Sequence, residues 1–372
     1  MSDPDLSSLR DSIAEVDRAL LELLRRRMEL ASEVGRIKAE TGAPVEVRDV
    51  EHIVLDRARQ HAEACGVSEE VMASMFQAII RGSVERQYRV GVSLRERRGE
   101  RMLIVGGAGG MGTWFRGFLE LAGHVVDVAD PALAGLPSPH PQGRFGSVGE
   151  IEDLDAYTAI WVTAPLNRMA VALEELISRR PQGPLVEVAS IKTPLLGALA
   201  RARDEGVRIF AVHPMFGPSK SVYETLTFVL AAQGDPIEEK RLLAPLLTHP
   251  YTKLVAVPFP HHDRLMGWLL GLSHLTNMLF GAALVRSGID AAELHACAST
   301  TYSHQAATAM RVLSEDPDLY LDIQYLNPHR NDVYAAAKEA LGQLVSLVTE
   351  RDREGLRQTF AEARRALSPE GD

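Results

Sequence analysis

The residue whose type and position are best suited to catalysis is His213, which opens the segment HPMFGPSK at positions 213–220. An apolar run, RIFAV, leads directly into this histidine, and Pro214 and Pro218 restrict the turn that follows. A neutral imidazole is the usual general base near neutral pH. The segment therefore predicts a proton acceptor held at the end of a strand. The alternative is a histidine at a capped strand end with no chemical role.

A second chemical segment, RMLIVGGAGGMG, contains a GxGxxG pattern at Gly107, Gly109 and Gly112. It follows an apolar strand, opens an amphipathic helix and leads to another strand, which is the context that dinucleotide binding requires. We expect Gly107 to permit the tight turn, Gly109 to let the backbone approach a pyrophosphate, and Gly112 to allow close packing of helix and strand. The alternative is a glycine-rich turn that binds no nucleotide.

Asp130 ends the strand that follows the glycine-rich segment. A carboxylate at this place can accept hydrogen bonds from a ribose 2′-OH and would repel a 2′-phosphate. The pattern therefore favours NAD over NADP.

Cations occupy a third unusual place, the apolar seam of one long helix predicted over residues 6–41. Positions spaced by three and four residues form the seam, and they are Leu6, Arg10, Ile13, Asp17, Leu20, Leu24, Arg27, Ala31, Val34 and Lys38. Burying cations costs several kcal/mol each unless anions meet them. The helix would be about 54 Å long, more than one small domain can cover. We therefore expect a helical dimer with a pocket for a dianion, the alternative being an ion-pair network within the seam.

The elements that must position these residues fall into three regions. Residues 6–87 show helical periodicity throughout, with a third helix that ends near Arg89. Short apolar strands then alternate with helices, which is typical of βαβ units and a parallel sheet. From about residue 262 the pattern is helical again. The prediction is an all-α N-terminal domain (1–90), a linker (91–100), an α/β Rossmann-like domain (101–260) and an all-α C-terminal domain for substrate binding and dimerisation (261–372).

Composition narrows the class of protein. The chain has 372 residues and a net charge of −10, which argues against nucleic acid as a partner. No apolar run in the sequence reaches the length of about 18 residues that a membrane span needs, so no span is expected. The polar start is unlike a secretory signal. Cys65 and Cys297 form no disulfide framework, so a cytoplasmic protein is expected. His261 and His262 lack other ligands at metal spacing, so no metal is expected.

With these residues in view, positions 6–90 resemble the all-helical class of chorismate mutase. The matching stretches are LRDSIAEVDRALLELLRRRMELASEVGRIK and QAIIRGSVERQ. The resemblance implies that Arg27 and Arg10 of the partner subunit bind the substrate carboxylates, with Ser83 near one of them. It also implies that Lys38 and Gln87 contact the ether oxygen and that Glu51 holds the C4 hydroxyl. The Claisen rearrangement needs no acid or base, only a compact conformer and cations near the breaking C–O bond.

One position departs from that family's pattern. Val50 stands immediately before Glu51, where family members usually carry arginine. Either Arg48 compensates, or the region around C4 of the substrate is altered.

Residues from about 101 to 366 resemble the prephenate dehydrogenase family. The motifs that carry the resemblance are GGAGGMG, ASIK, HPMFGP, HDRLMGWLLGLSHL, AMRVLSEDPDLYLDI and HRN. It implies that His213 accepts the proton of the C4 hydroxyl of prephenate and that Ser190 orients this histidine beside the nicotinamide. His274 is then expected to line the pocket and Arg311 to bind the pyruvyl carboxylate. Without the resemblance, Ser190 is more simply a helix cap and His274 a core histidine. The expected NAD-binding residues are Gly107, Gly109, Met111, Gly112, Asp130 and Pro165.

Together the two resemblances imply a fused, homodimeric enzyme of tyrosine biosynthesis. It would convert chorismate to prephenate, and then prephenate to 4-hydroxyphenylpyruvate with NAD. Because of Val50, a rival hypothesis keeps this chemistry but places an amino group at C4 of both substrates. Two hypotheses of a different class are a helical domain that only dimerises or regulates, and a non-enzymatic NAD sensor.

Overall fold

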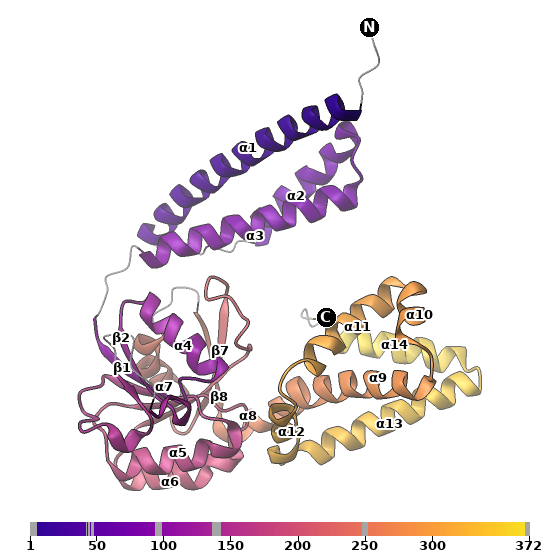
Figure 1. The fold of residues 1–372 in the computed structure, drawn as a ribbon. Coiled ribbons are helices and arrows are strands. Elements are labelled where there is room, and N and C mark those ends of the chain that lie inside the picture. The colour runs from indigo at the N-terminus through magenta and orange to yellow at the C-terminus, as the bar shows by residue number, and fades with distance from the viewer. Residues whose placement is uncertain are drawn as a thin grey trace.

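The computed structural model describes residues 6–41, 43, 45, 48–93, 99–135, 143–247 and 252–368. Figure 1 shows three bodies along the chain: a layer of N-terminal helices, a central sheet flanked by helices, and a group of C-terminal helices. This order confirms the predicted fold class.

The N-terminal body consists of α1 (Leu6–Thr41), α2 (Arg48–Ala62), the short η1 (Glu63–Cys65) and α3 (Glu69–Ser93). The first helix has the bounds that its periodicity predicts. The Ser68 hydroxyl accepts a hydrogen bond from the Val71 N–H at 3.3 Å, so this serine caps α3. However, α3 continues past Arg89 to Ser93, so the predicted linker begins as helix. Residues 94–98 of that linker lie outside the described residues.

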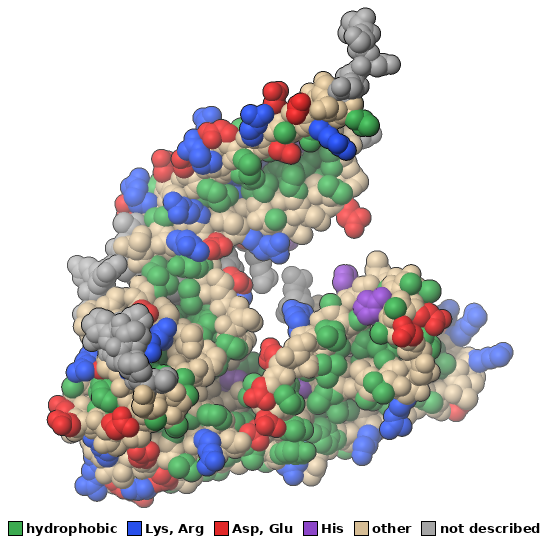
Figure 2. Space-filling view, in the orientation of Figure 1, with side chains coloured by type: hydrophobic (Ala, Val, Ile, Leu, Met, Phe, Trp, Pro, Cys, Tyr) green, Lys and Arg blue, Asp and Glu red, His purple; other side chains and the backbone are tan. Residues whose placement is uncertain are grey.

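A large part of the apolar surface of α1 is exposed in the single chain. Ala31 and Gly35 are its buried residues, and Ile13 is 60% exposed. Figure 2 shows hydrophobic side chains at the surface of the N-terminal body. The exposed apolar residues of α1 include Leu6, Leu9, Ile13, Val16, Leu20, Val34 and Ile37. A surface of this kind suits a helical dimer.

The central body is an eight-stranded sheet in the order β3-β2-β1-β4-β5-β6-β7-β8. The strands are β1 (Arg101–Val105), β2 (Val125–Ala129), β3 (Arg144–Phe145), β4 (Ala159–Val162), β5 (Leu185–Glu187), β6 (Ile209–Pro214), β7 (Leu226–Ala232) and β8 (Thr252–Pro258). All neighbours pair in parallel except β6 and β7. In such sheets, ligands bind at the carboxyl ends of the strands where the strand order reverses, here between β1 and β4.

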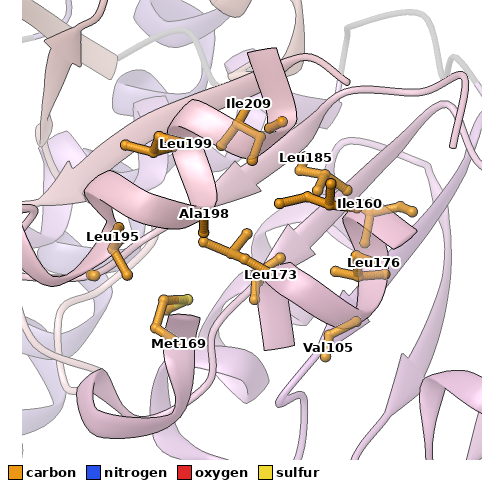
Figure 3. Close-up of a cluster of buried hydrophobic side chains, with 14 of the residues drawn as sticks. Val105, Ile160, Met169, Leu173, Leu176, Leu185, Leu195, Ala198, Leu199 and Ile209 are labelled. Atoms are coloured by element: carbon orange, nitrogen blue, oxygen red, sulfur yellow. The ribbon is translucent and has the colours of Figure 1, made fainter. Parts of the chain in front are cut away.

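Both faces of the sheet are buried, as parallel strands require. One face carries α5 (Leu166–Ser178) and α6 (Leu196–Asp204), which Figure 1 shows together on the same side. Figure 3 shows their leucines meeting the sheet, with Leu173 and Leu176 beside Ile160 and Leu185. The other face packs against the aromatic rings of α4 (Gly110–Leu121). Helix α7 (Pro236–Leu243) lies between β7 and β8 in the chain.

The C-terminal body is entirely helical. Its elements are α8 (Phe259–Met266), the π-helical η6 (Gly267–Leu272), α9 (Ser273–Ser287), α10 (Ala291–Ala296), α11 (Thr300–Leu313), α12 (Pro317–Leu326), α13 (Arg330–Thr349) and α14 (Arg353–Leu367). Helices α8 to α9 form one continuous helix over Phe259–Ser287. By length and composition alone this helix is long and apolar enough to cross a membrane, and a single such helix is weak evidence for a membrane span. Its apolar window is only 11% buried, which also fits a helix that packs on a second subunit.

Candidate active sites

His213 lies at the end of β6, opposite Val229 of β7, and is 4% exposed. The turn after it is anchored on α4. The indole N–H of Trp114 donates to the carbonyl oxygen of Lys220 at 2.7 Å, and the rings of Trp114 and Phe216 lie 4.8 Å apart. The sequence therefore correctly predicted a histidine held by a fixed turn at a strand end.

A chain of buried hydrogen bonds runs from His213 into α8. Its Nδ1 lies 3.2 Å from Nε2 of His262, and Nδ1 of His262 lies 2.7 Å from Oδ1 of Asp263. The Asp263 carboxylate also accepts hydrogen bonds from the backbone N–H groups of Lys192 and Thr193, at 2.9 and 2.7 Å. The side chains of His213, His262 and Asp263 are all buried.

A buried ion pair lies beside this chain. Nζ of Lys192 is 2.6 Å from Oε1 of Glu187 and 2.9 Å from the carbonyl oxygen of Val212, the residue before His213. Burial lowers the pKa of His213 well below its usual value of 6.5, and the nearby His262 and Lys192 act in the same direction. His213 is therefore neutral at physiological pH, which is the state that a general base needs.

The sequence analysis gave no role to His262, Asp263, Lys192 or Glu187. Two signals could have found them. Glu187 interrupts an otherwise apolar strand, and a charge there requires a buried partner. His262 and Asp263 lie side by side near the start of an apolar helix, but His262 was weighed only with His261, as a metal site. Within the described residues, no group of three or more His, Cys, Asp or Glu could hold a metal ion.

Ser190 follows β5 and precedes the short helix η4 (Thr193–Leu195), as the sequence predicts. Strands β5 and β6 are parallel neighbours, so Ser190 and His213 lie at the same edge of the sheet. Ser190 is partly exposed, and the structure records no hydrogen bond between it and His213. The partner of Nδ1 of His213 is Nε2 of His262 instead. An orienting role for Ser190 stays a prediction.

The glycine-rich turn joins β1 to α4 with one change from the expected roles. Gly106 has φ +86°, so it makes the tight turn that was assigned to Gly107. A Cβ on Gly107 would lie 2.2 Å from Cγ1 of Val128, so this position allows the turn to pack on β2. A Cβ on Gly112 would lie 2.3 Å from the carbonyl oxygen of Gly106. That close approach of helix and turn is the one predicted.

The residues around this turn fit a dinucleotide. Asp130 Oδ2 accepts a hydrogen bond from the Ala108 N–H at 3.0 Å, so the carboxylate lies against the glycine-rich turn. Gly109 is the extended N-cap of α4 and is exposed, which leaves the helix N-terminus open to a phosphate. Pro165 is the exposed N-cap of α5, and Met111 packs beside the aromatic cluster of α4.

The dinucleotide region adjoins the turn after His213. A Cβ on Gly110, the first residue of α4, would lie 3.1 Å from Cγ of Pro218. The two motifs that the sequence singled out, HPMFGPSK and the glycine-rich turn, therefore meet at the carboxyl edge of the sheet.

His274 and Arg311 lie in the C-terminal body. Nδ1 of His274 is buried and has no hydrogen-bond partner among the described residues, and burial lowers the pKa of His274 to about 4. Its ring meets the edge of Tyr320, whose hydroxyl donates to Glu315 at 2.9 Å. A Cβ on Gly217 would lie 3.9 Å from Glu315, so this group faces the turn after His213. Arg311 is exposed on α11, and its binding role stays a prediction.

Four of the residues predicted from the mutase resemblance form two pairs on the N-terminal helices. Arg27 pairs with Ser83, and Lys38 lies near Glu51. Arg27 donates hydrogen bonds to the Ser83 hydroxyl and to the carbonyl oxygen of Ile79, the latter at 3.2 Å. Lys38 donates to the carbonyl oxygen of Val45 at 2.8 Å. Burial lowers the pKa of both cations, and at Lys38 the nearby Glu51 carboxylate partly offsets that effect.

Gln87 lies on α3, one helical turn after Ser83. Its Oε1 is buried without a hydrogen-bond partner among the described residues, and an unpaired buried polar atom is costly unless a ligand satisfies it. Gly35 lets α1 approach α3 here, because its Cβ would lie 2.7 Å from the Gln87 Cα. Arg10, in contrast, is exposed near the start of α1, and Val50 is 55% exposed. The side chain of Arg48 lies outside the described residues.

Comparison with known proteins places both ends of the chain in families. Residues 9–88 match the family model for chorismate mutase type II. Residues 259–362 match the model for the prephenate dehydrogenase dimerization domain.

Individual relatives extend the comparison, and two of the three cover most of the chain. A T-protein of Enterobacter agglomerans is 26% identical over 96% of this chain and 91% of its own length. A chorismate mutase of Methanocaldococcus jannaschii is 31% identical over 22% of this chain and 86% of its own length. A 4-amino-4-deoxyprephenate dehydrogenase of Streptomyces pristinaespiralis is 28% identical over 73% of this chain and 92% of its own length.

A solved structure supports the fold of the central and C-terminal bodies. Prephenate dehydrogenase from A. aeolicus, in complex with hydroxyphenyl propionate and NAD⁺, superposes with a TM-score of 0.57 and 18% identity. It covers 73% of this chain, and the match spans 97% of that structure. The chain thus belongs to the family in which an all-helical chorismate mutase is fused to a prephenate dehydrogenase.

Proposed function

We propose that this protein converts chorismate to prephenate and then oxidises prephenate to 4-hydroxyphenylpyruvate with NAD⁺. One observation carries the proposal. The chain matches a T-protein along nearly its whole length, with the chorismate mutase match at residues 9–88 followed by the prephenate dehydrogenase match at residues 259–362. The cation cluster lies on the N-terminal helices, and His213 lies beside the glycine-rich turn of the sheet.

In the first reaction the protein supplies no proton transfer. Arg27, with Arg10 of the partner subunit, would hold the two carboxylates of chorismate and select its compact conformer. Lys38 and Gln87 would direct hydrogen-bond donors at the ether oxygen, where negative charge develops as the C–O bond breaks. The lowered exposure of Arg27 and Lys38 strengthens these interactions, because charges act more strongly in a less polar surrounding.

In the second reaction His213 accepts the proton of the C4 hydroxyl of prephenate. The C4–H bond breaks as hydride leaves, the bond from C1 to the ring carboxylate breaks to give CO₂, and the ring becomes aromatic as a phenolate. His213 then returns the proton to the phenolate oxygen, which gives the hydroxyl of 4-hydroxyphenylpyruvate. The glycine-rich turn and Asp130 would hold NAD⁺, which would supply the acceptor for the hydride. Arg311 would bind the pyruvyl carboxylate, because the ring carboxylate must leave as neutral CO₂.

Dimerisation and location complete the proposal. The exposed apolar surfaces of α1 and of the helix Phe259–Ser287 suit two subunit interfaces, and the second lies within the region that matches a dimerization-domain model. A homodimer in the cytoplasm accounts for these surfaces without a membrane.

The test is a coupled assay on the purified full chain. With chorismate and NAD⁺ together, we expect loss of chorismate absorbance followed by NADH formation and release of one CO₂ per NADH. Prephenate and NAD⁺ alone should give the second step only. Mutase turnover without any NADH from prephenate would contradict the dehydrogenase half.

A second candidate keeps the residues and changes the C4 substituent to an amino group. Val50, next to Glu51, and the similarity to a 4-amino-4-deoxyprephenate dehydrogenase support it. The same assay with the amino analogues decides between the two. Rapid turnover of the analogues and no turnover of chorismate would favour this candidate.

A further inference from the structure

The buried chain His213–His262–Asp263 has a direction that hydrogen-bond chemistry fixes. Burial alone would raise the pKa of Asp263, but hydrogen bonds from His262, Thr193 and the backbone of Lys192 outweigh it and lower the pKa to about 2. The carboxylate is therefore ionised and can only accept. Nδ1 of His262 must be the donor across the 2.7 Å contact.

The next contact follows from the first. Burial lowers the pKa of His262, so its ring is neutral, and a neutral ring with a proton on Nδ1 has a lone pair on Nε2. The 3.2 Å contact with His213 then requires a proton on Nδ1 of His213. A neutral His213 in that tautomer has its lone pair on Nε2, the nitrogen that is free to accept a proton from a substrate.

We propose that Asp263, acting through His262, fixes the tautomer of His213 that can accept the substrate proton. His262 and Asp263 are positioning residues in this role, since both are buried and act through His213. The inference rests on the proposed dehydrogenase function of His213. It gives His262 and Asp263 the orienting role that the family resemblance implies for Ser190.

Asp263 is itself fixed in orientation. Its Oδ2 accepts from the Thr193 N–H at 2.7 Å and from the Thr193 hydroxyl at 2.6 Å, while the Lys192 N–H is shared between Oδ1 at 2.9 Å and Oδ2 at 3.1 Å. Two donors are thus specific to Oδ2. These donors would hold the oxygen of an asparagine at the Oδ2 place. The asparagine NH₂ would then face His262 and donate to its Nδ1.

With this geometry, Asp263→Asn should reverse the direction of both hydrogen bonds, the one to His262 and the one between His262 and His213. Once Nδ1 of His262 accepts, its proton moves to Nε2, which donates to Nδ1 of His213. His213 then carries its proton on Nε2 and cannot accept another there. We expect the dehydrogenase kcat to fall by about 10²- to 10⁴-fold, the range seen when a base is lost or held in the wrong tautomer.

Two variants of His262 serve as matched controls. His262→Gln keeps an acceptor toward His213 and a donor toward Asp263, so we expect a kcat within about tenfold of wild type. His262→Leu keeps the volume but leaves the tautomer of His213 unconstrained, so its kcat should lie between those of His262→Gln and Asp263→Asn. The KM for prephenate should change little in all three. Unchanged mutase turnover in the same full chains shows that the fold is intact.

Nitrogen NMR of ¹⁵N-histidine-labelled full chain reads the tautomer without any turnover. We expect His213 to be protonated on Nδ1 in wild type and in His262→Gln, and on Nε2 in Asp263→Asn. Protonation on Nε2 in wild type, or equal kcat losses in all three variants, would overturn the proposal. A wild-type chain that produces no NADH would contradict the proposed function instead, and the NMR result would still stand.

Discussion

The two candidate sites differ in how much of each a single chain completes. On the N-terminal helices, Arg27, Ser83 and Lys38 lie in a half-open cluster, and apolar residues of α1 such as Ile13 are 60% exposed. At the end of β6, His213 is 4% exposed and His262 is fully buried. Their hydrogen bonds are complete within one chain.

The difference follows from the chemistry of the two proposed reactions. A rearrangement without proton transfer needs charges around its substrate, and these can come from two subunits across a helical seam. A general base needs a set pKa and a set tautomer, and both depend on a closed network of rigid neighbours. The proposed mutase site is thus open in a single chain, whereas the hydrogen bonds around the proposed base are complete in one chain.

Removing the base should produce the largest separation between the sites. In His213→Asn we expect the dehydrogenase kcat to fall by about 10²- to 10⁴-fold, because the proton acceptor is lost. Mutase turnover of the same protein should equal that of wild type. Steady-state assays of both activities check this, and an equal fall in both would mean that the sites are not separate.

Removing a cation from the proposed mutase site should have the converse effect. Arg27→Ala should lower mutase kcat by about 10²- to 10³-fold, as loss of a charge-stabilising donor does, and leave NADH formation from prephenate unchanged. Arg26→Ala is the matched control, since Arg26 is exposed on the same helix. A wild-type mutase rate in Arg27→Ala would favour a helical domain that only dimerises.

The cofactor preference should change by a smaller factor. Asp130→Asn keeps a side chain that can accept from Ala108 but removes the charge. We expect the KM for NAD⁺ to rise about five- to tenfold, the difference between a charged and a neutral hydrogen bond, with improved use of NADP⁺. Asp235→Asn, which alters a similar helix cap on α7, should leave both values unchanged. Unaltered KM values in Asp130→Asn would remove this residue from the cofactor site.

The pH profile should show the smallest effect. Burial lowers the pKa of His213 well below 6.5, so the neutral base persists as the pH falls through 6.5. The acidic limb of dehydrogenase kcat/KM, which reports the free enzyme, should therefore lie below that value. A limb centred at or above 6.5 would show that His213 is not the buried base described here.

The sequence predicted those parts of the fold that a local, periodic pattern of residues specifies. The spacing of apolar residues fixed the bounds of α1, and the glycine pattern located the turn before α4. The last strand that the sequence analysis named is the apolar run RIFAV. Strands β7 and β8 follow it through an antiparallel pairing that the alternating rhythm of strands and helices does not anticipate. The two-residue β3 is too short for periodicity to detect.

The site was predictable where one motif carries its own context, as at His213 and Asp130. It was not predictable where residues distant in sequence meet in space. Asp263 contacts the backbone of Lys192, and His262 contacts His213, across different elements. The exchange of roles between Gly106 and Gly107 depends on backbone angles, which a pattern of glycines does not specify.

The most direct test of the contrast between the sites is a heterodimer of two defective full chains. Arg10→Ala and Arg27→Ala, coexpressed with different tags and purified through both, form one intact and one doubly defective mutase site if Arg10 acts across the interface. We predict about half the wild-type mutase activity for this heterodimer, from one working site of two, with near-zero activity in each homodimer. Dehydrogenase activity should match wild type throughout. A heterodimer as inactive as its parents would contradict the claim that a second chain completes the mutase site.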